Sequence, residues 1–236
     1  MNLMQITDQL CDDTAKLAFE PPITTVYNPL QYARAGWEAY IRAFGGKPRE
    51  ILLLGMNPGP FGMVQTGVPF GDVPSVRDWM GIETSIAKPS RQHPRRPVDG
   101  FSCSRREVSG RRLWGWAAKR FGKPERFFER FFVSNYCPLC FLEESGRNRT
   151  PDKLKAGERI PLFRACDSAL ASQVDYFRPQ YILGIGAFAE KRIRKALEGR
   201  DLQIGRLLHP SPANPAANRG WEDAVEKTFK HMGIDI

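Results

Sequence analysis

The sequence predicts an α/β fold with a mainly parallel sheet and helices on both of its faces. Short apolar runs such as residues 51–54 are continuous, which is typical of strands buried on both sides. Such runs alternate with segments of helical period, as in sheets whose parallel strands are joined by helices. The 236 residues suffice for one sizeable domain, and we expect a single domain over 1–236 because no repeat or linker divides the chain.

The first part of the chain is expected to form two helices and a strand. Apolar residues recur at helical spacing over 3–19, and Pro21-Pro22 ends that helix. We expect this helix, within residues 1–25, to be peripheral. A second helical pattern covers 30–44 and stops at two glycines. The apolar run that follows predicts the first buried strand.

The middle of the chain is expected to be irregular. Residues 58–108 are rich in Pro, Gly and Arg, and only a short helix near 76–82 interrupts the loop. A long irregular stretch inside a compact domain is usually functional. A helix over 109–121 and a strand over 131–136 follow, and the polar segment 143–159 is interpreted as a surface loop.

The last part of the chain alternates regularly between the two kinds of element. We expect, in order, a helix over 161–177, a strand over 181–183, a helix to about 197, a strand over 202–208 and a helix over 216–232.

The charge balance indicates a polyanionic partner. Lys and Arg total 35 against 26 Asp and Glu, a net charge of +9, and eight of these cations lie within residues 88–112. Phosphate contacts supply most non-specific affinity for DNA, so this segment is a candidate contact surface. A solvated basic loop is the alternative.

Other composition features bear on the compartment. No segment approaches the run of about 18 apolar residues that a membrane span needs, and residues 1–20 lack the basic start and apolar core of a signal peptide. The five cysteines are an odd number, which argues against a disulfide framework. We therefore expect a reducing cytoplasm, or the nucleus if the cell is eukaryotic.

Two stiff loops follow predicted strands and carry the candidate catalytic groups. Residues 55–62 (GMNPGPFG) contain Asn57, and residues 209–215 (HPSPANP) begin with His209. Ligands of open α/β sheets bind beyond the carboxyl ends of the strands, so the two loops are interpreted as halves of one active site. An Asn-Pro turn and a structural histidine are the alternatives.

These loops, together with 66–71 (TGVPFG), 107–115 (EVSGRRLWG) and 134–139 (SNYCPL), resemble the single-strand-selective monofunctional uracil-DNA glycosylases. The resemblance implies the three-layer α/β/α sandwich of the uracil-DNA glycosylase superfamily, around a four-stranded parallel sheet. It also implies hydrolysis of the N-glycosidic bond of deoxyuridine in DNA, which leaves an abasic site. A monofunctional enzyme uses water, so no lysine Schiff base, metal or other cofactor is expected.

The resemblance also implies roles for the two catalytic candidates. Asn57 would hold the water that attacks C1′ of the sugar, at a position where other superfamily members carry an Asp. His209 would donate a hydrogen bond to uracil O2, which strengthens as the leaving base becomes anionic.

Four further residues match the base pocket of that family. Phe70 would stack on the extruded base, although packing is the commoner role of a Phe. Asn135 would read uracil O4 and N3–H with its amide, whereas a structural Asn is the alternative. Gly59 and Met63 would border the pocket and tolerate a substituent at the pyrimidine 5 position.

The remaining expectations concern DNA contacts. Arg111 and Arg112 would face phosphates. The loop residues Pro210, Ser211, Pro212, Ala213 and Asn214 would enter the duplex where the nucleotide leaves it. Ala213 departs from the pattern, because vertebrate relatives carry an Arg there, and a small residue makes a weaker wedge. We expect a monomer that acts on uracil in single- and double-stranded DNA, while the ranking of 5-substituted and deaminated bases stays open.

Two motifs suggest other functions. Residues 184–189 (GIGAFA) resemble a dinucleotide-binding turn, but tight strand-to-helix packing also explains them. Cys137 and Cys140 form a C-x-x-C pair without a second pair, so no metal is expected. The rival functions are a non-catalytic single-strand DNA-binding module and a nucleotide-binding α/β enzyme.

Overall fold

The protein is described by a computed structural model that covers residues 1–46 and 48–236. Its strands are β1 (Ile23–Tyr27), β2 (Ile51–Gly55), β3 (Phe131–Asn135), β4 (Cys140–Glu143), β5 (Asn148–Arg149), β6 (Tyr181–Ile185) and β7 (Gln203–Leu207). Its α-helices are α1 (Leu3–Ala15), α2 (Pro29–Tyr32), α3 (Arg34–Phe44), α4 (Met63–Thr66), α5 (Val108–Phe121), α6 (Pro124–Phe128), α7 (Ala156–Phe177), α8 (Ala187–Ala196) and α9 (Pro215–His231).

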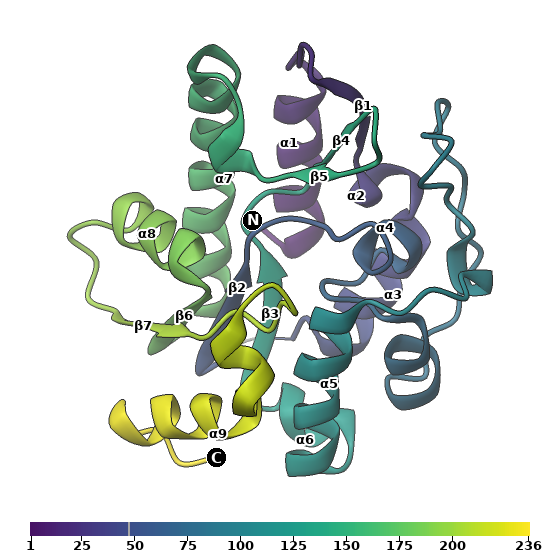
Figure 1. Ribbon diagram of the computed structural model, residues 1–236. Helices are drawn as coiled ribbons and strands as arrows, with labels where there is room; N and C mark the ends of the chain where they lie inside the picture. The colour runs from purple at the N-terminus through teal and green to yellow at the C-terminus, as the bar shows by residue number, and fades with distance from the viewer. Residues whose placement is uncertain (47) are drawn as a thin grey trace.

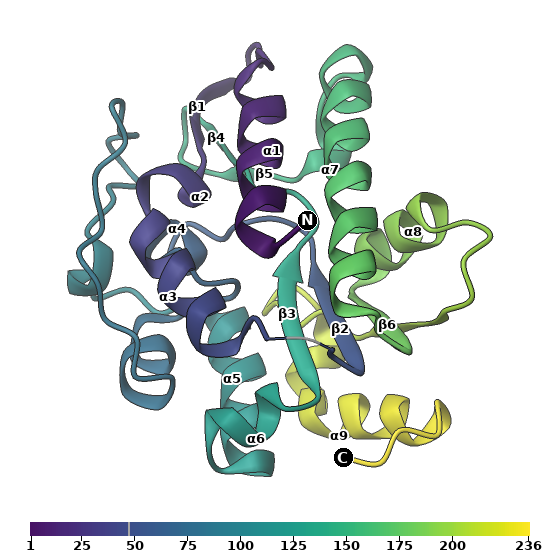
Figure 2. The same cartoon turned by 180° about the vertical axis from the view of Figure 1, so that it is seen from behind.

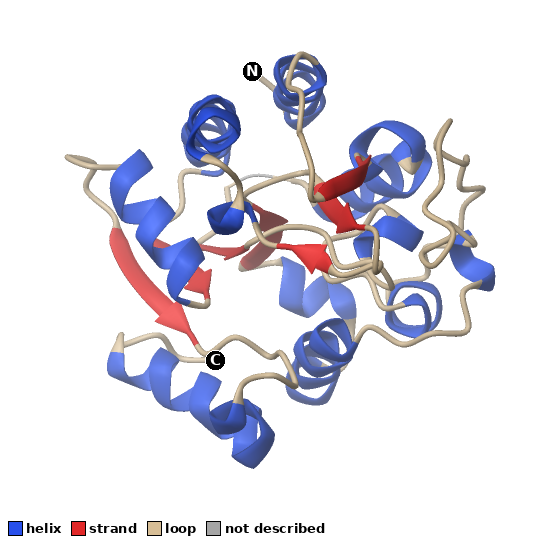
Figure 3. Cartoon of the chain, turned by 45° about the horizontal axis from the view of Figure 1, so that its top comes forward, coloured by secondary structure: helices blue, strands red, loops and turns tan. Residues whose placement is uncertain are grey.

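The central sheet confirms the predicted fold class. Its four strands are all parallel and follow the order β3-β2-β6-β7. In Figure 3 the helices lie on both sides of these strands, and Figure 1 shows α1 beside α7 and α5 above α6. Parallel strands covered on both faces need continuous apolar runs, and β2 and β3 are buried along their whole length.

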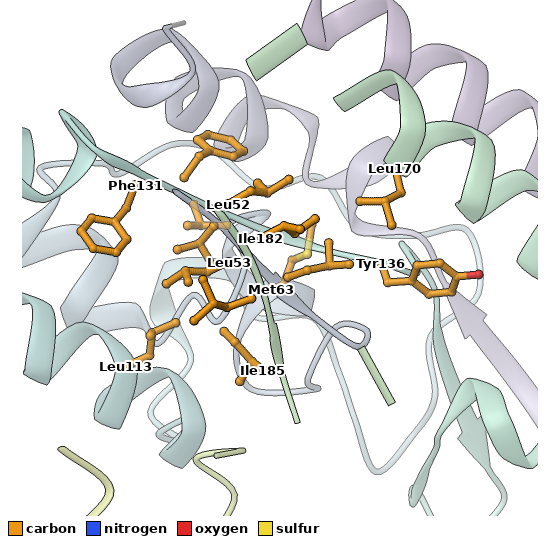
Figure 4. Packing of buried hydrophobic residues seen from close by; sticks show 14 of the residues in the cluster. Leu52, Leu53, Met63, Leu113, Phe131, Tyr136, Leu170, Ile182 and Ile185 are labelled. Carbon is orange, nitrogen blue, oxygen red and sulfur yellow. The ribbon is translucent and has the colours of Figure 1, made fainter. Parts of the chain in front are cut away.

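The core fills both interfaces between the sheet and its helices. Leu52, Leu53 and Ile182 lie at its centre in Figure 4, with Phe131 toward one side and Leu170 toward the other. This packing leaves the carboxyl ends of the strands as the open edge of the sheet. A site at this end of the sheet is therefore built from the loops that follow the buried strands.

The N-terminal helix is more than peripheral. Although α1 lies in an outer layer beside α7 (Figure 2), it buries Leu3, Ile6 and Leu10 in the main hydrophobic core. It ends at Ala15, before the predicted limit of 19, and the next residues lead into β1, which the apolar pattern did not indicate.

A second sheet was missed altogether. Strands β1, β4 and β5 pair antiparallel in the order β1-β4-β5. β5 lies in the segment interpreted as a surface loop, and no element was expected over β1 or most of β4. The supposed surface loop 143–159 thus holds β5 and also the start of α7, where Pro161 lies within the helix and does not begin it. The segment 30–44 divides into α2 and α3 at Ala33, and the short helix α6 was not predicted.

The long segment 58–108 is irregular, as predicted. It contains α4, one turn of π-helix over Ser75–Trp79 and one turn of 3-10 helix over Gly100–Ser102. No helix in the described chain is long and apolar enough to cross a membrane.

Candidate active site

A cavity of about 350 Å³ opens at the carboxyl ends of β2 and β3, below the loop that follows β7. Every residue expected to act on the base or to bind it contributes to the lining, although these residues come from four separate parts of the chain. The lining consists of Met56, Asn57, Gly59, Pro60, Met63, Phe70, Glu107, Ser109, Asn135, Asn148, Thr150, His209 and Ser211.

Asn57 is held through the nitrogen of its amide. Nδ2 donates to the carbonyl oxygen of Leu139 at 3.1 Å and more weakly to Oδ1 of Asn148 at 3.5 Å. Leu139 directly precedes β4 and Asn148 lies in β5, so the small sheet fixes the loop that carries Asn57. Because Nδ2 makes both contacts, Oδ1 remains an unused acceptor among the described residues. An acceptor held in this way can position a water molecule.

Phe70 is held in an unusual backbone conformation. Its φ of 54° is rare for a residue with a bulky side chain. Its carbonyl oxygen accepts hydrogen bonds from Trp114 Nε1 at 3.0 Å and from the Asp72 backbone N–H at 2.7 Å. Gly110 allows this approach, since a Cβ there would lie 1.9 Å from the same oxygen. Strain maintained by its surroundings is typical of a functional position.

Asn135 and Phe70 border the same space. Asn135 ends β3 directly opposite Gly55 of β2, and the residue as a whole is 9% exposed. A Cβ on Gly55 would lie 2.3 Å from Asn135 Oδ1 and 2.6 Å from Phe70 Cε2. On the other side, Nδ2 of Asn135 lies 3.3 Å from Sδ of Met63. The Phe70 ring and the Asn135 amide thus converge against the backbone of Gly55, and the part of the cavity that these two side chains border is the slot.

We expect Gly55→Ala to close this slot. The added methyl group must displace the Asn135 amide or the Phe70 ring, so a planar ligand should bind about 10- to 100-fold more weakly. Gly115→Ala is the matched control, because a Cβ at Gly115 meets no atom within 4 Å. Titration of both variants with a substrate oligonucleotide checks the prediction. Equal affinities for the two would show that the slot is not the ligand site.

His209 follows β7 and has a defined tautomer. Its Nδ1 accepts the backbone N–H of Ser211 at 3.1 Å, so the proton of the neutral ring is on Nε2. Burial lowers the pKa of His209, which favours this neutral form. The ring packs on Gly186, where a Cβ would lie 3.2 Å from Cδ2. His209 is therefore arranged as a hydrogen-bond donor through Nε2.

The loop after His209 is anchored at its far end. Asn214 caps α9 by accepting from the Ala216 backbone N–H, and its Nδ2 contacts the His209 carbonyl oxygen at 3.4 Å. Pro212 and Ala213 are exposed between these anchors, whereas Pro210 is buried. The exposed tip is thus carried on a short, stiff loop.

The two arginines expected to face phosphates differ in their surroundings. Arg112 donates to the Pro210 carbonyl oxygen at 3.0 Å and to Asn218 Oδ1 at 2.8 Å, and Asn218 in turn donates to the Pro212 carbonyl oxygen. Arg112 therefore stabilises the loop 210–214 through hydrogen bonds. Arg111 is exposed on α5 and lies outside the cavity lining.

Glu107 is the lining residue whose importance the sequence pattern did not show. Among the described residues it is the sole carboxyl group of the cavity lining, and burial raises its pKa. A Cβ on Gly59 would lie 2.4 Å from its Oε2, so the side chain packs directly on the Asn57 loop. Ser109, Asn148 and Thr150 were also missed. The motif 107–115 could have indicated Glu107, whereas 148–150 carries no periodic signal.

The two competing motifs have structural explanations. A Cβ on Gly184 would lie 2.2 Å from the Glu190 backbone nitrogen, so this glycine permits close packing of β6 on α8. Cys137 and Cys140 are both buried and unpaired. Within residues 1–46 and 48–236, no group of three or more His, Cys, Asp or Glu is placed to hold a metal ion.

Comparison with known proteins extends these observations. Residues 43–232 match the model of the uracil DNA glycosylase superfamily. The chain is 46% identical to a single-strand selective monofunctional uracil-DNA glycosylase of Rattus norvegicus over 94% of its own length and 81% of the relative. Its counterpart in Mus musculus is 45% identical over 94% and 80%. The crystal structure of wild-type SMUG2 of Pedobacter heparinus superposes with a TM-score of 0.67 at 20% identity, covering 97% of this chain and 98% of that one.

Proposed function

The chain belongs to the single-strand-selective monofunctional uracil-DNA glycosylases, and on that basis we propose how its pocket removes uracil from DNA. It is a DNA repair hydrolase that acts on N-glycosyl bonds. The observation that carries the proposed mechanism is the convergence of Asn57, Phe70, Asn135 and His209 on one cavity at the sheet edge. A base inside a duplex cannot reach such a cavity, so the nucleotide must be extruded.

The proposed recognition step uses Phe70 and Asn135. The ring replaces the neighbours that the base loses when it leaves the stack. Asn135 donates from Nδ2 to uracil O4 and accepts N3–H at Oδ1. Cytosine presents the reverse pattern and leaves buried polar groups unpaired, which is the strongest form of discrimination a pocket offers.

The proposed chemical steps use His209 and Asn57. As the bond between C1′ and N1 of uracil lengthens, the sugar gains oxocarbenium character and the base gains negative charge. His209 Nε2–H stabilises that charge at O2, because the donor is preorganised by the Ser211 bond. Water held by Asn57 Oδ1 then attacks C1′ and loses a proton to solvent, while the uracil anion takes up a proton, leaving an abasic site and free uracil.

The finer parts of the proposal concern substrates and partners. We expect action on double-stranded as well as single-stranded DNA, with Arg111 on the backbone and the exposed tip of residues 210–214 at the vacated position. Gly59 and Met63 line the cavity, and we propose that they tolerate a substituent at the pyrimidine 5 position, with other deaminated bases as further candidates. Since one chain supplies the whole cavity, and all five cysteines are unpaired, we propose a monomer in a reducing cytoplasm.

Single-turnover incubation with a single-stranded oligonucleotide that holds one deoxyuridine tests this function. We expect strand scission at that site only after hot alkali, with undiminished activity in EDTA. Scission without alkali would contradict a monofunctional mechanism. An intact strand despite tight, base-independent binding would favour the non-catalytic binding module, and thermal stabilisation by a dinucleotide would favour the nucleotide-binding enzyme.

A further inference from the structure

Three side chains form a cationic stack at the rim of the cavity. The guanidinium carbon of Arg105 lies 4.2 Å from the centre of the Phe61 ring, and that of Arg96 lies 5.3 Å from the same centre. Phe61 follows Pro60, which lines the cavity. Residues 96–105 thus place two positive charges on the ring of Phe61, beside the site.

Neither charge is neutralised by the protein. Asp72 pairs with Arg106, and Glu143 pairs with Arg149. The partly buried Glu107 packs on Gly59 and Gly62 beside Phe61 but makes no ion pair with either guanidinium. Across residues 1–46 and 48–236, no carboxylate lies within 4.0 Å of the guanidinium of Arg96 or Arg105. Because the two guanidinium carbons lie 4.2 Å and 5.3 Å from the same ring centre, their separation is below the Debye length of about 10 Å at 0.1 M salt, so the two cations repel each other.

The stack also adjoins the second sheet. A Cβ on Gly146, in the turn between β4 and β5, would lie 3.2 Å from the guanidinium carbon of Arg96. The next strand begins with Asn148, which lines the cavity and contacts Asn57. The stack therefore lies beside the part of the cavity lined by Pro60 and Asn148. The loop 210–214, which follows β7, forms a different part of the cavity wall.

We propose that Arg96 and Arg105, held on Phe61, bind a backbone phosphate of the DNA strand that enters the cavity. The inference rests on the proposed function. Two planar guanidinium groups match the oxygens of a phosphodiester, whose negative charge relieves their repulsion. A contact to the target strand itself needs no complementary strand, so the stack supports binding of single-stranded DNA.

The test is the double variant Arg96→Gln/Arg105→Gln, with Arg42→Gln/Arg126→Gln as a control of equal charge. Arg42 and Arg126 are exposed on α3 and α6, which precede β2 and β3 and so lie away from the carboxyl ends of the strands. Affinity is measured over a range of KCl for a single-stranded oligonucleotide with one 2′-fluoro-2′-deoxyuridine, whose fluorine slows cleavage. We expect the rim variant to bind about fivefold more weakly at low salt, and its salt slope to fall by about 0.7 to 1. The control should stay near wild type.

Single methylphosphonate replacements along the oligonucleotide then locate the contact. Wild type should lose affinity at one phosphate near the modified uridine, and the rim variant should be insensitive to replacement at that phosphate. An unchanged salt slope, or the same phosphate profile in wild type and variant, would overturn the proposal. Release of uracil from a cleavable oligonucleotide at saturating enzyme is scored separately. If wild type released none, the proposed function would fail while the binding measurements still decided the role of the stack.

Discussion

Asn57→Ala should lower the single-turnover rate of uracil release about a thousandfold, within the range typical of a residue that positions and activates a nucleophile. DNA affinity should change by no more than about threefold, because the side chain touches the water and not the strand. The change removes Oδ1, the unused acceptor, together with the contacts of Nδ2 to Leu139 and Asn148. Rates at saturating enzyme and binding to the 2′-fluoro oligonucleotide separate the two effects.

Asn57→Asp probes the same position with the acceptor retained. A carboxylate there would oppose the carbonyl oxygen of Leu139 and Oδ1 of Asn148, both of which now accept from Nδ2. We therefore expect Asn57→Asp to stay well below wild type despite its resemblance to an Asp general base. Equal losses of rate and affinity in Asn57→Ala would refute the assigned role.

Asn57 shows which part of the site could be predicted from the sequence. A continuous apolar run followed by Pro and Gly predicts a buried strand and a stiff loop, and local patterns of this kind positioned Asn57, Asn135 and His209 at one sheet edge. Parallel strands share that edge whatever the loops do. The position of the cavity at the carboxyl ends of the strands was therefore predictable from the parallel arrangement.

What the sequence pattern could not supply is the group behind each site residue. Asn148 belongs to a strand of two residues, too short to carry any alternation. Trp114 and Gly110, which hold the Phe70 carbonyl, look like ordinary helix residues until α5 is packed against the loop. Such contacts depend on tertiary arrangement and have no local periodicity.

Arg112 illustrates the same limit for charged residues. A basic residue in a cationic protein suggests a phosphate contact, yet the structure directs its donors to Pro210 and Asn218. Its charge is used to shape the loop that meets DNA. The sequence showed that the region is cationic, but only the packing separates a supporting arginine from the unneutralised pair on Phe61.

His209→Ala should also reduce the rate strongly, by about 100- to 1000-fold, as expected on removal of one preorganised donor to a developing anion. His209→Gln returns an N–H donor near the position of Nε2, so it should recover part of the loss. A change in affinity alone, with the rate intact, would exclude the proposed role. Quenched single-turnover assays compare the rates of uracil release by the two variants.

The pH dependence supplies an independent check on His209. Burial lowers its pKa below the ordinary 6.5, so at neutral pH the ring is uncharged, with Nδ1 accepting from Ser211 and Nε2–H free to donate. Acidification through that lowered pKa protonates Nδ1 and breaks the Ser211 bond. The rate should therefore be flat above about pH 7 and fall on the acid side.

Glu107, whose pKa burial raises, also lies in this pocket, so Glu107→Gln is needed to separate the two groups. A fall in rate on the acid side that persists in Glu107→Gln and disappears in His209→Gln belongs to His209. A rate that rose on acidification would instead identify the imidazolium as the active form.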